Sequence, residues 1–215
     1  MTYQLQLQHF IFNEVAIDMF VPDAAHVQQW YLQQQTLDAA AIFPYWSKVW
    51  TAANAMALFI TAHPHCIKNK KVLELACGLA LPSLIAAKYA SHVCCSDYVQ
   101  DAVEVVMQSV KYNAFRHVAC AVLDWEKLPP EIAADVILLS DINYEPEKFD
   151  ALYKMLSVFL NKGSTIILST PQRLMAKPFI ERLLSFVIQQ ENIDVQENDS
   201  TTITPATVFV LSRKN

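Results

Sequence analysis

The stretch from Lys71 to Pro82, KVLELACGLALP, constrains the fold more than any other part of this chain. Its first six residues predict a buried strand, within which Glu74 is an unexpected carboxylate, because a buried charge is costly without a partner or a ligand. Cys77-Gly78 predicts a short turn, and Pro82 suits the first turn of a helix, where its missing N–H group costs nothing. Strand, tight turn and helix in this order present free backbone N–H groups to a nucleotide-like ligand.

A second apolar stretch, His92 to Ser96, predicts another strand and ends in Asp97, which stands 19 positions after Gly78. In doubly wound sheets an acid about 20 positions after the glycine turn binds a ribose. The chain has only two glycines, and Ala76 and Ala80 stand where a dinucleotide fingerprint would have others. Without these glycines a pyrophosphate is disfavoured. A ligand with a ribose and no phosphate fits better, and S-adenosylmethionine is such a ligand.

Strands and helices alternate from this point on, which predicts right-handed crossovers and a largely parallel sheet. We expect a Rossmann-like, doubly wound α/β fold with a seven-stranded, mostly parallel sheet. The link from Glu197 to Pro205 is short, so the last strand should run antiparallel to its predecessor. Strands are expected near 71–76, 92–96, 118–123, 135–140, 164–170, 192–197 and 206–212, and helices near 82–90, 99–113, 146–161 and 173–189.

The N-terminal part predicts an extension of strands and a helix. Residues 3–21 alternate between polar and apolar around Asn13-Glu14, which is typical of a hairpin. Asp23 suits the cap of a helix to about Gln35, and Thr51 begins another helix. At 215 residues we expect a single domain, residues 1–215, with an extension over 1–42 and a core over 43–215.

Composition excludes several classes of protein. The chain is 53% hydrophobic but has no apolar run of about 18 residues, so we expect no membrane span. The N-terminus lacks a basic region followed by an apolar core, and the five cysteines form no CxxC pair, which favours reduced thiols in the cytoplasm. A net charge of −5 argues against nucleic-acid binding. We expect no metal site, and a monomer.

The carboxyl ends of parallel strands form the ligand-binding edge of such a sheet. Three of the first four ends carry an acid, which favours a cationic or hydroxyl-rich ligand. The residues at these ends are Ala76-Cys77-Gly78, Asp97-Tyr98, Asp124-Trp125, Ser140-Asp141 and Thr170-Pro171.

Four segments resemble the seven-β-strand methyltransferases, and more narrowly the protein-lysine methyltransferase family known as methyltransferase family 16. They are VLELACGLALPSLIAA (motif I), CSDYVQDAVEVVMQSVKYN (the following strand and helix), LDW (the adenine side) and DVILLSDINYEPEKFDAL (the D-x-x-Y segment). Trp50 stands where the family has its upstream tryptophan, and the resemblance covers about residues 43–170. The chain departs from the family at Ala76 and Ala80, where motif I has glycines, and at Thr51, where proline is common.

This resemblance implies an S-adenosylmethionine-dependent methyltransferase that methylates a lysine side chain of a protein. It implies that Trp50 covers the cofactor and that Asp97 binds its ribose. The methionine part would be bordered by Glu74, Ala76, Cys77 and Gly78. Asp124 and Trp125 would flank the adenine, and Ser140 would lie near the sulfonium. The implied catalytic residues are Asp141, which would capture and orient the amine, and Tyr144, which would wall or hydrogen-bond it. A carboxylate also favours the ammonium form of an amine, which opposes the proton loss that methylation needs.

Other interpretations stay open. Adenine and glutamine methyltransferases use [DN]-P-P-[YF] where this chain has Asp141-Ile142-Asn143-Tyr144, without prolines. The same fold also serves small-molecule N- or O-methyltransferases. A cofactor-binding or scaffold module without turnover is the alternative that the missing motif I glycines keep open. Among single residues, Trp50 and Trp125 could be core packing, Glu74 and Asp97 ordinary strand-end acids, and Asp141 a helix cap.

Overall fold

A seven-stranded sheet forms the centre of the computed structural model, which describes residues 3–196 and 202–213. The strand order is β5-β4-β3-β6-β7-β9-β8, and β9 is antiparallel to both of its neighbours while the other pairings are parallel. This confirms the predicted Rossmann-like fold class. The strands are β3 (Lys71–Glu74), β4 (His92–Asp97), β5 (Val118–Val122), β6 (Val136–Ser140), β7 (Thr165–Pro171), β8 (Val187–Gln196) and β9 (Ile203–Leu211).

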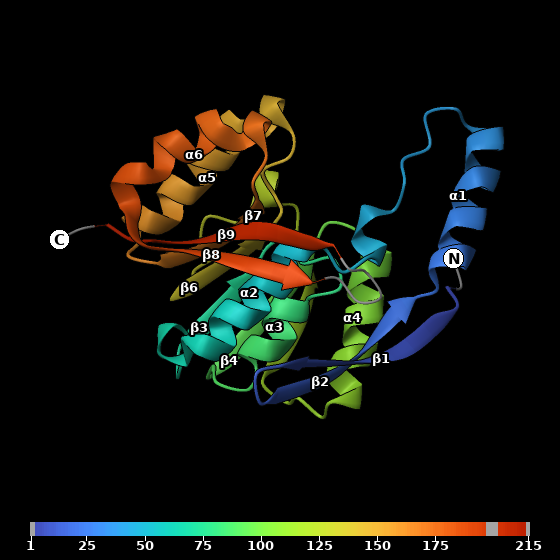
Figure 1. The fold of residues 1–215 in the computed structure, drawn as a ribbon, viewed down its shortest axis with the longest axis horizontal. Coiled ribbons are helices and arrows are strands. Elements are labelled where there is room, and N and C mark those ends of the chain that lie inside the picture. Colours follow the sequence, from blue (N-terminus) through green and yellow to red (C-terminus); the bar gives the residue numbers. More distant parts are fainter. Residues whose placement is uncertain (1–2, 197–201, 214–215) are drawn as a thin grey trace.

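Helices cover both faces of the sheet (Figure 1). One face carries α2 (Thr51–Ala62), α3 (Leu81–Ala86) and α4 (Gln100–Tyr112), and the other carries α5 (Phe149–Asn161) and α6 (Lys177–Leu183). Successive residues of β6 serve the two cores in turn, because side chains alternate along a strand. Val136 and Leu138 belong to the first core, and Ile137 and Leu139 to the second.

The N-terminal extension is the predicted hairpin followed by a helix. Strands β1 (Leu5–Phe12) and β2 (Val15–Pro22) pair antiparallel, and Asp23 caps α1 (Ala24–Leu37) by accepting a hydrogen bond from the backbone N–H of His26 at 2.8 Å. The hairpin packs on α4, whereas α1 stands apart from the sheet (Figure 1). The extension therefore reaches beyond the sheet that carries the expected site.

Several predicted boundaries are wrong. The helix expected over 173–189 is α6, which ends at Leu183, and a 3-10 turn (Leu184–Phe186) leads directly into β8. Val187 pairs with Leu211 of β9, so strand pairing decides the structure of an apolar stretch that also suits a helix. The helix expected from 146 begins as α5 at Phe149, after the 3-10 turn Pro146–Lys148. Position 197, expected to end a strand, lies outside the described residues.

Within residues 3–196 and 202–213, no helix is long and apolar enough to cross a membrane. The five cysteines all lie in this described part and are free thiols. The division into an extension over 1–42 and a core over 43–215 stays a prediction.

Candidate active site

The motif I turn has three residues in the left-handed conformation that glycine favours, but only one of the three is a glycine. Ala76, Gly78 and Ala80 have φ values of 52°, 52° and 58°, in the left-handed region. For a residue other than glycine this region costs about 1–2 kcal/mol. Hydrogen bonds from Cys77 N–H to the Ser96 carbonyl at 2.9 Å and from Ala80 N–H to the Cys77 carbonyl at 2.7 Å hold the turn. The two alanines therefore preserve the shape of the turn at some cost in stability.

The two alanine methyl groups lie in different surroundings. Ala80 is 1% exposed and belongs to the core that packs α2 and α3, so its methyl group lies among core residues rather than in an open crevice. Ala76 is half-buried and packs against the core of the opposite face. A side chain at Gly78 would place its Cβ 3.3 Å from the Trp46 carbonyl oxygen. Of these three positions, Gly78 is therefore the one with least room for a side chain.

Asp97 joins the turn to the end of β4, as its spacing predicts. Its two carboxylate oxygens accept hydrogen bonds from Gly78 N–H at 2.9 Å and Val99 N–H at 3.0 Å, and it is 4% exposed. Burial raises the pKa of Asp97, and the backbone hydrogen bonds oppose this. A carboxylate oxygen can accept more than one hydrogen bond, so both retain acceptor capacity for a ribose hydroxyl. The ribose role of Asp97 stays a prediction.

Glu74 lies at the end of β3 and is fully buried. Its Oε2 accepts a hydrogen bond from Ser83 N–H in α3 at 3.0 Å, and its Oε1 has no hydrogen-bond partner among the described residues. Burial raises the pKa of Glu74 to about 8, although the bonds to Ser83 lower it. The side chain is therefore largely a neutral acid at pH 7, which lessens the cost of burying it.

Trp50 is fixed at the start of α2. Its indole Nε1–H donates to the Tyr45 carbonyl at 2.8 Å, and the Lys48 Nζ lies 5.1 Å from its ring centroid. The 3-10 turn Tyr45–Ser47, which contains both Tyr45 and Trp46, also lies against Gly78. Trp50 and the motif I turn therefore both contact the segment Tyr45–Ser47, and the cofactor role of Trp50 stays a prediction.

Asp124 and Trp125 follow β5, where the sequence predicts them. Asp124 caps the 3-10 turn Trp125–Lys127 by accepting from Glu126 N–H at 2.9 Å, and this bond lowers its pKa. Trp125 is half-buried, and the Lys148 Nζ lies 6.0 Å from its ring centroid. The structure gives Asp124 a local role in the turn, and its adenine role stays a prediction.

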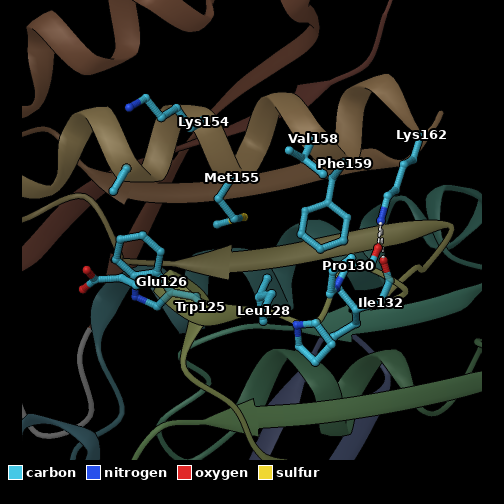
Figure 2. A pocket seen from close by; sticks show the side chains of 12 residues that line it. Trp125, Glu126, Leu128, Pro130, Ile132, Lys154, Met155, Val158, Phe159 and Lys162 are labelled. Atoms are coloured by element: carbon cyan, nitrogen blue, oxygen red, sulfur yellow. Dashed lines mark hydrogen bonds between the residues drawn. The ribbon is translucent and has the colours of Figure 1, made fainter.

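Trp125 also lines a cavity of about 490 Å³ between residues 125–132 and α5 (Figure 2). The wall is mainly apolar, with Leu128, Met155 and Phe159 pointing into it (Figure 2). Of the residues predicted for the site, the lining contains Trp125 alone. The cavity thus lies beside the predicted cofactor site, on the α5 side of Trp125.

Asp141 directly follows β6 and half-buried Ser140, and has a φ of 57°. Its carboxylate accepts two hydrogen bonds from the Arg173 guanidinium, from Nη1 to Oδ1 and from Nη2 to Oδ2, the second at 3.0 Å. The side chain of Asp141 is 10% exposed and that of Arg173 is 32% exposed. Burial raises the pKa of Asp141, and Arg173 opposes the rise. The following turn, Pro146–Lys148, has Glu145 at its N-cap, so Asp141 is no cap.

Tyr144 is 47% exposed beyond Asp141. Burial, followed by the Glu145 carboxylate, raises its pKa to about 12, and Tyr98 contributes to this rise. Its hydroxyl therefore stays protonated near neutral pH. Tyr98, which follows Asp97 and is 67% exposed, lies close enough to Tyr144 to affect its ionisation. Two exposed aromatic side chains thus come from the segments that follow β4 and β6.

Sequence reasoning assigned no role to Arg173 or Tyr98. Arg173 lies two residues beyond β7, which is the neighbour of β6 in the sheet. Ser140 of β6 is in register with Ser169 of β7, so the residues after both strands come together. The signal in the sequence that could have indicated this ion pair is the presence of Arg173 just after β7, the strand next to the one that Asp141 follows.

The residues at this edge of the sheet fit S-adenosylmethionine in chemical type. The Asp97 carboxylate offers acceptors for ribose hydroxyls, and the ring of Trp125 is the aromatic group predicted for the adenine. Glu74, whose buried Oε1 has no hydrogen-bond partner among the described residues, ends the strand that leads into the turn. All of these side chains are present although Ala76 and Ala80 replace glycines of motif I.

A family model described as lysine methyltransferase matches residues 4–186. The human histone-arginine methyltransferase METTL23 is 31% identical over 143 residues, which are 63% of this chain and 75% of that protein. The matches cover 57%, 64% and 46% of the METTL23 proteins of Mus musculus, Rattus norvegicus and Xenopus laevis. The protein N-lysine methyltransferase METTL21A of Danio rerio is 32% identical over 127 residues, 56% of this chain and 57% of that protein.

Solved structures show the same fold. The 16S rRNA N2 G1207 methyltransferase RsmC of T. thermophilus, solved with AdoMet and guanosine, superposes with a TM-score of 0.64 at 15% identity. The superposition covers 98% of this chain and 51% of the RsmC chain. At this identity the likeness concerns the fold.

Proposed function

Because this chain belongs to the lysine methyltransferase family, we propose that it methylates the side-chain amine of a lysine in a protein substrate. Membership confirms the predicted class of enzyme, an S-adenosylmethionine-dependent methyltransferase, and its cofactor. The observation that carries the choice of lysine is the state of Asp141, whose carboxylate already holds the guanidinium of Arg173.

Arginine is the second candidate acceptor, favoured by the name of the human relative, a histone-arginine methyltransferase. A guanidinium remains charged in proteins and binds a carboxylate best through two parallel N–H donors. On Asp141 this pair of acceptor positions is taken by Arg173, so a substrate arginine would have to displace it. A lysine amine needs a single acceptor, and the second lone pair of either oxygen provides one. The site therefore suits lysine better.

Each residue group has a separate task in this proposal. When bound, S-adenosylmethionine supplies an activated methyl group on a cationic sulfur. Asp97 would hold its ribose, Gly78 would border its methionine part, and Trp50 would cover it. Asp141 would hold the acceptor nitrogen in line, and Tyr144 would form an aromatic wall that excludes water. Such positioning is worth about 7–11 kcal/mol in well-oriented systems.

We also propose that the protein works as a monomer in the cytoplasm, on another protein. Free cysteines support a reducing compartment, and the family match supports a protein substrate. Gel filtration of the purified chain should give a mass near 24.3 kDa. A mass near twice that value would contradict the monomer.

Methyl transfer to cell proteins tests the acceptor. Purified protein and S-adenosylmethionine carrying a tritiated methyl group are incubated with a desalted cell lysate whose own methyltransferases have been inactivated by heat, and the proteins are hydrolysed for separation of methylated amino acids. We expect label in methyllysine, and none with Asp141→Asn as the catalyst. Label in methylarginine would establish the second candidate. Label found only in small molecules, when the lysate is not desalted, would favour the small-molecule alternative, and no label anywhere would overturn the proposal.

A further inference from the structure

The ion pair between Asp141 and Arg173 bears on how an amine loses its proton at this site. We propose that Arg173 is a positioning residue that neutralises Asp141, so that the carboxylate binds the lysine acceptor as a neutral amine rather than as an ammonium ion. This inference rests on the proposed function and names a residue to which that function assigns no other task. Arg173 acts through Asp141 and needs no contact with the substrate.

The backbone brings the two side chains together. Asp141 N–H donates to the Ser169 carbonyl at 2.9 Å, so the ladder between β6 and β7 continues past the end of β6. The left-handed φ of 57° at Asp141 then ends the strand. Arg173 follows β7 and binds both carboxylate oxygens. Arg173 is the more exposed partner of this pair and Asp141 the more buried one.

The charge of this pair decides the protonation state of an amine beside it. A lysine amine has a reference pKa of about 10.4, and a lone carboxylate nearby raises it further. An Asp–Arg pair has no net charge, so it accepts a hydrogen bond from a neutral amine while giving little extra stability to the ammonium form. Removing the guanidinium charge should therefore raise the pKa of the bound amine and push turnover to higher pH.

The other ionisable groups near this site do not replace Arg173. Tyr144 stays protonated because its pKa is raised to about 12, and Tyr98 beside it is a phenol as well. Glu145 and Lys148 act on Tyr144 from the following turn, where the Lys148 Nζ lies 3.4 Å from the Glu145 carboxylate. Lys148 also bonds Glu126 at 3.0 Å, so its charge is shared with two carboxylates.

The reaction balances with these groups. The substrate ammonium releases one proton to solvent on binding, and Asp141 accepts a hydrogen bond from the neutral amine. The nitrogen lone pair forms the new bond to the methyl carbon while the carbon–sulfur bond breaks with its electrons left on sulfur. The product nitrogen carries the positive charge and the thioether product is neutral. Neither Asp141 nor Arg173 gains or loses a proton overall.

Rates of methyl transfer measured across pH 6.5 to pH 10 test this role. The assay uses the tritiated-methyl transfer into proteins of the heat-inactivated, desalted lysate, which needs no identified substrate. Arg173→Gln removes the charge and keeps a hydrogen-bond donor, and Arg173→Lys keeps the charge and loses the two-pronged geometry. Arg173→Met serves as the neutral variant if circular dichroism shows that Arg173→Gln is unfolded. Arg182→Gln is the matched control, because Arg182 also binds an aspartate 32 residues away, Asp150, but on the surface.

We expect the midpoint of the rate profile to move up by about one pH unit in the neutral variant, so that the rate at pH 7 falls roughly tenfold while the rate at pH 10 approaches that of the wild type. Arg173→Lys should keep the wild-type midpoint at a lower plateau, and Arg182→Gln should match the wild type. A neutral variant that is slower by the same factor at every pH would overturn the inference and leave the proposed function standing. A wild-type protein without activity at any pH would overturn both.

Discussion

Ala76 and Ala80 both place backbone strain in the motif I turn, because both have a positive φ. Their methyl groups are buried to different extents, so replacing each alanine by glycine should change the stability of the protein differently. Glycine at either position removes about 1–2 kcal/mol of left-handed strain but adds roughly 0.5–1 kcal/mol of chain entropy to the unfolded state. Ala80 would also lose a buried methyl group, worth about 0.8 kcal/mol, whereas half-buried Ala76 loses less. We expect Ala76→Gly to stabilise the protein by about 0.5–1 kcal/mol and Ala80→Gly to change little.

Urea unfolding of both variants measures this difference directly. Gly78→Ala gives the reverse experiment, and it should destabilise more than Gly163→Ala. Both glycines have positive φ, but a Cβ at Gly78 meets the Trp46 carbonyl oxygen at 3.3 Å while nothing lies within 4 Å of one at Gly163. Equal losses in the two alanine variants would show that Trp46 does not confine the turn.

Glu74 should make the stability of the protein depend on pH in a direction opposite to that of most acids. Its pKa is raised by burial from the ordinary 4.5 to about 8, so the folded state binds its proton more tightly than the unfolded state. The stabilisation is complete below about pH 4.5 and is lost as the pH rises towards 8. In urea unfolding between pH 5 and pH 8.5, Glu74→Gln should show a weaker decline than the wild type. Parallel curves for the two proteins would contradict this ionisation.

At the scale of elements, the hairpin depends on α4 for some of its backbone hydrogen bonds. Phe20 N–H of β2 donates to the Ser109 hydroxyl at 3.0 Å, and the Asn113 amide donates to the Asp18 carbonyl at 2.5 Å. Ser109→Ala leaves the Phe20 N–H without this acceptor, which should cost about 1–3 kcal/mol. We expect faster amide exchange in β2, with exchange in β6 unchanged. Ser157→Ala is the control, because that hydroxyl bonds only within α5 among the described residues.

The elements show where sequence reasoning succeeds. The hairpin, the cap at Asp23 and the strand–turn–helix around Gly78 were predictable, because each follows from local periodicity or a local hydrogen bond. The end of α6 was not, because pairing with β9 draws residues from Val187 onward into a strand. The intrinsic preference of a segment for helix predicts its structure poorly when the segment can pair with the edge of a sheet.

At the scale of the whole molecule, the sheet order decides what the site contains. The sequence placed Asp97 and Asp141 at strand ends, and both lie there. The ion pair of Arg173 with Asp141 could not be predicted, because the two residues are 32 positions apart and come together only because β6 and β7 are neighbours in the sheet. Likewise, the hydrogen bond from Gly78 N–H to the Asp97 carboxylate depends on the packing of β3 beside β4. Such partners follow from topology, which residue spacing alone does not provide.

Calorimetric titration of S-adenosylhomocysteine into the purified protein tests the central claim, that the edge of the sheet around Gly78 and Asp97 holds the cofactor while Asp141 serves the acceptor. We expect the wild type to bind with a Kd on the order of 1 μM or below, Asp97→Asn at least about tenfold more weakly, and Asp141→Asn as tightly as the wild type. Circular dichroism of each variant confirms that it is folded. A wild-type protein that binds neither S-adenosylhomocysteine nor S-adenosylmethionine would contradict the account and favour a scaffold without turnover.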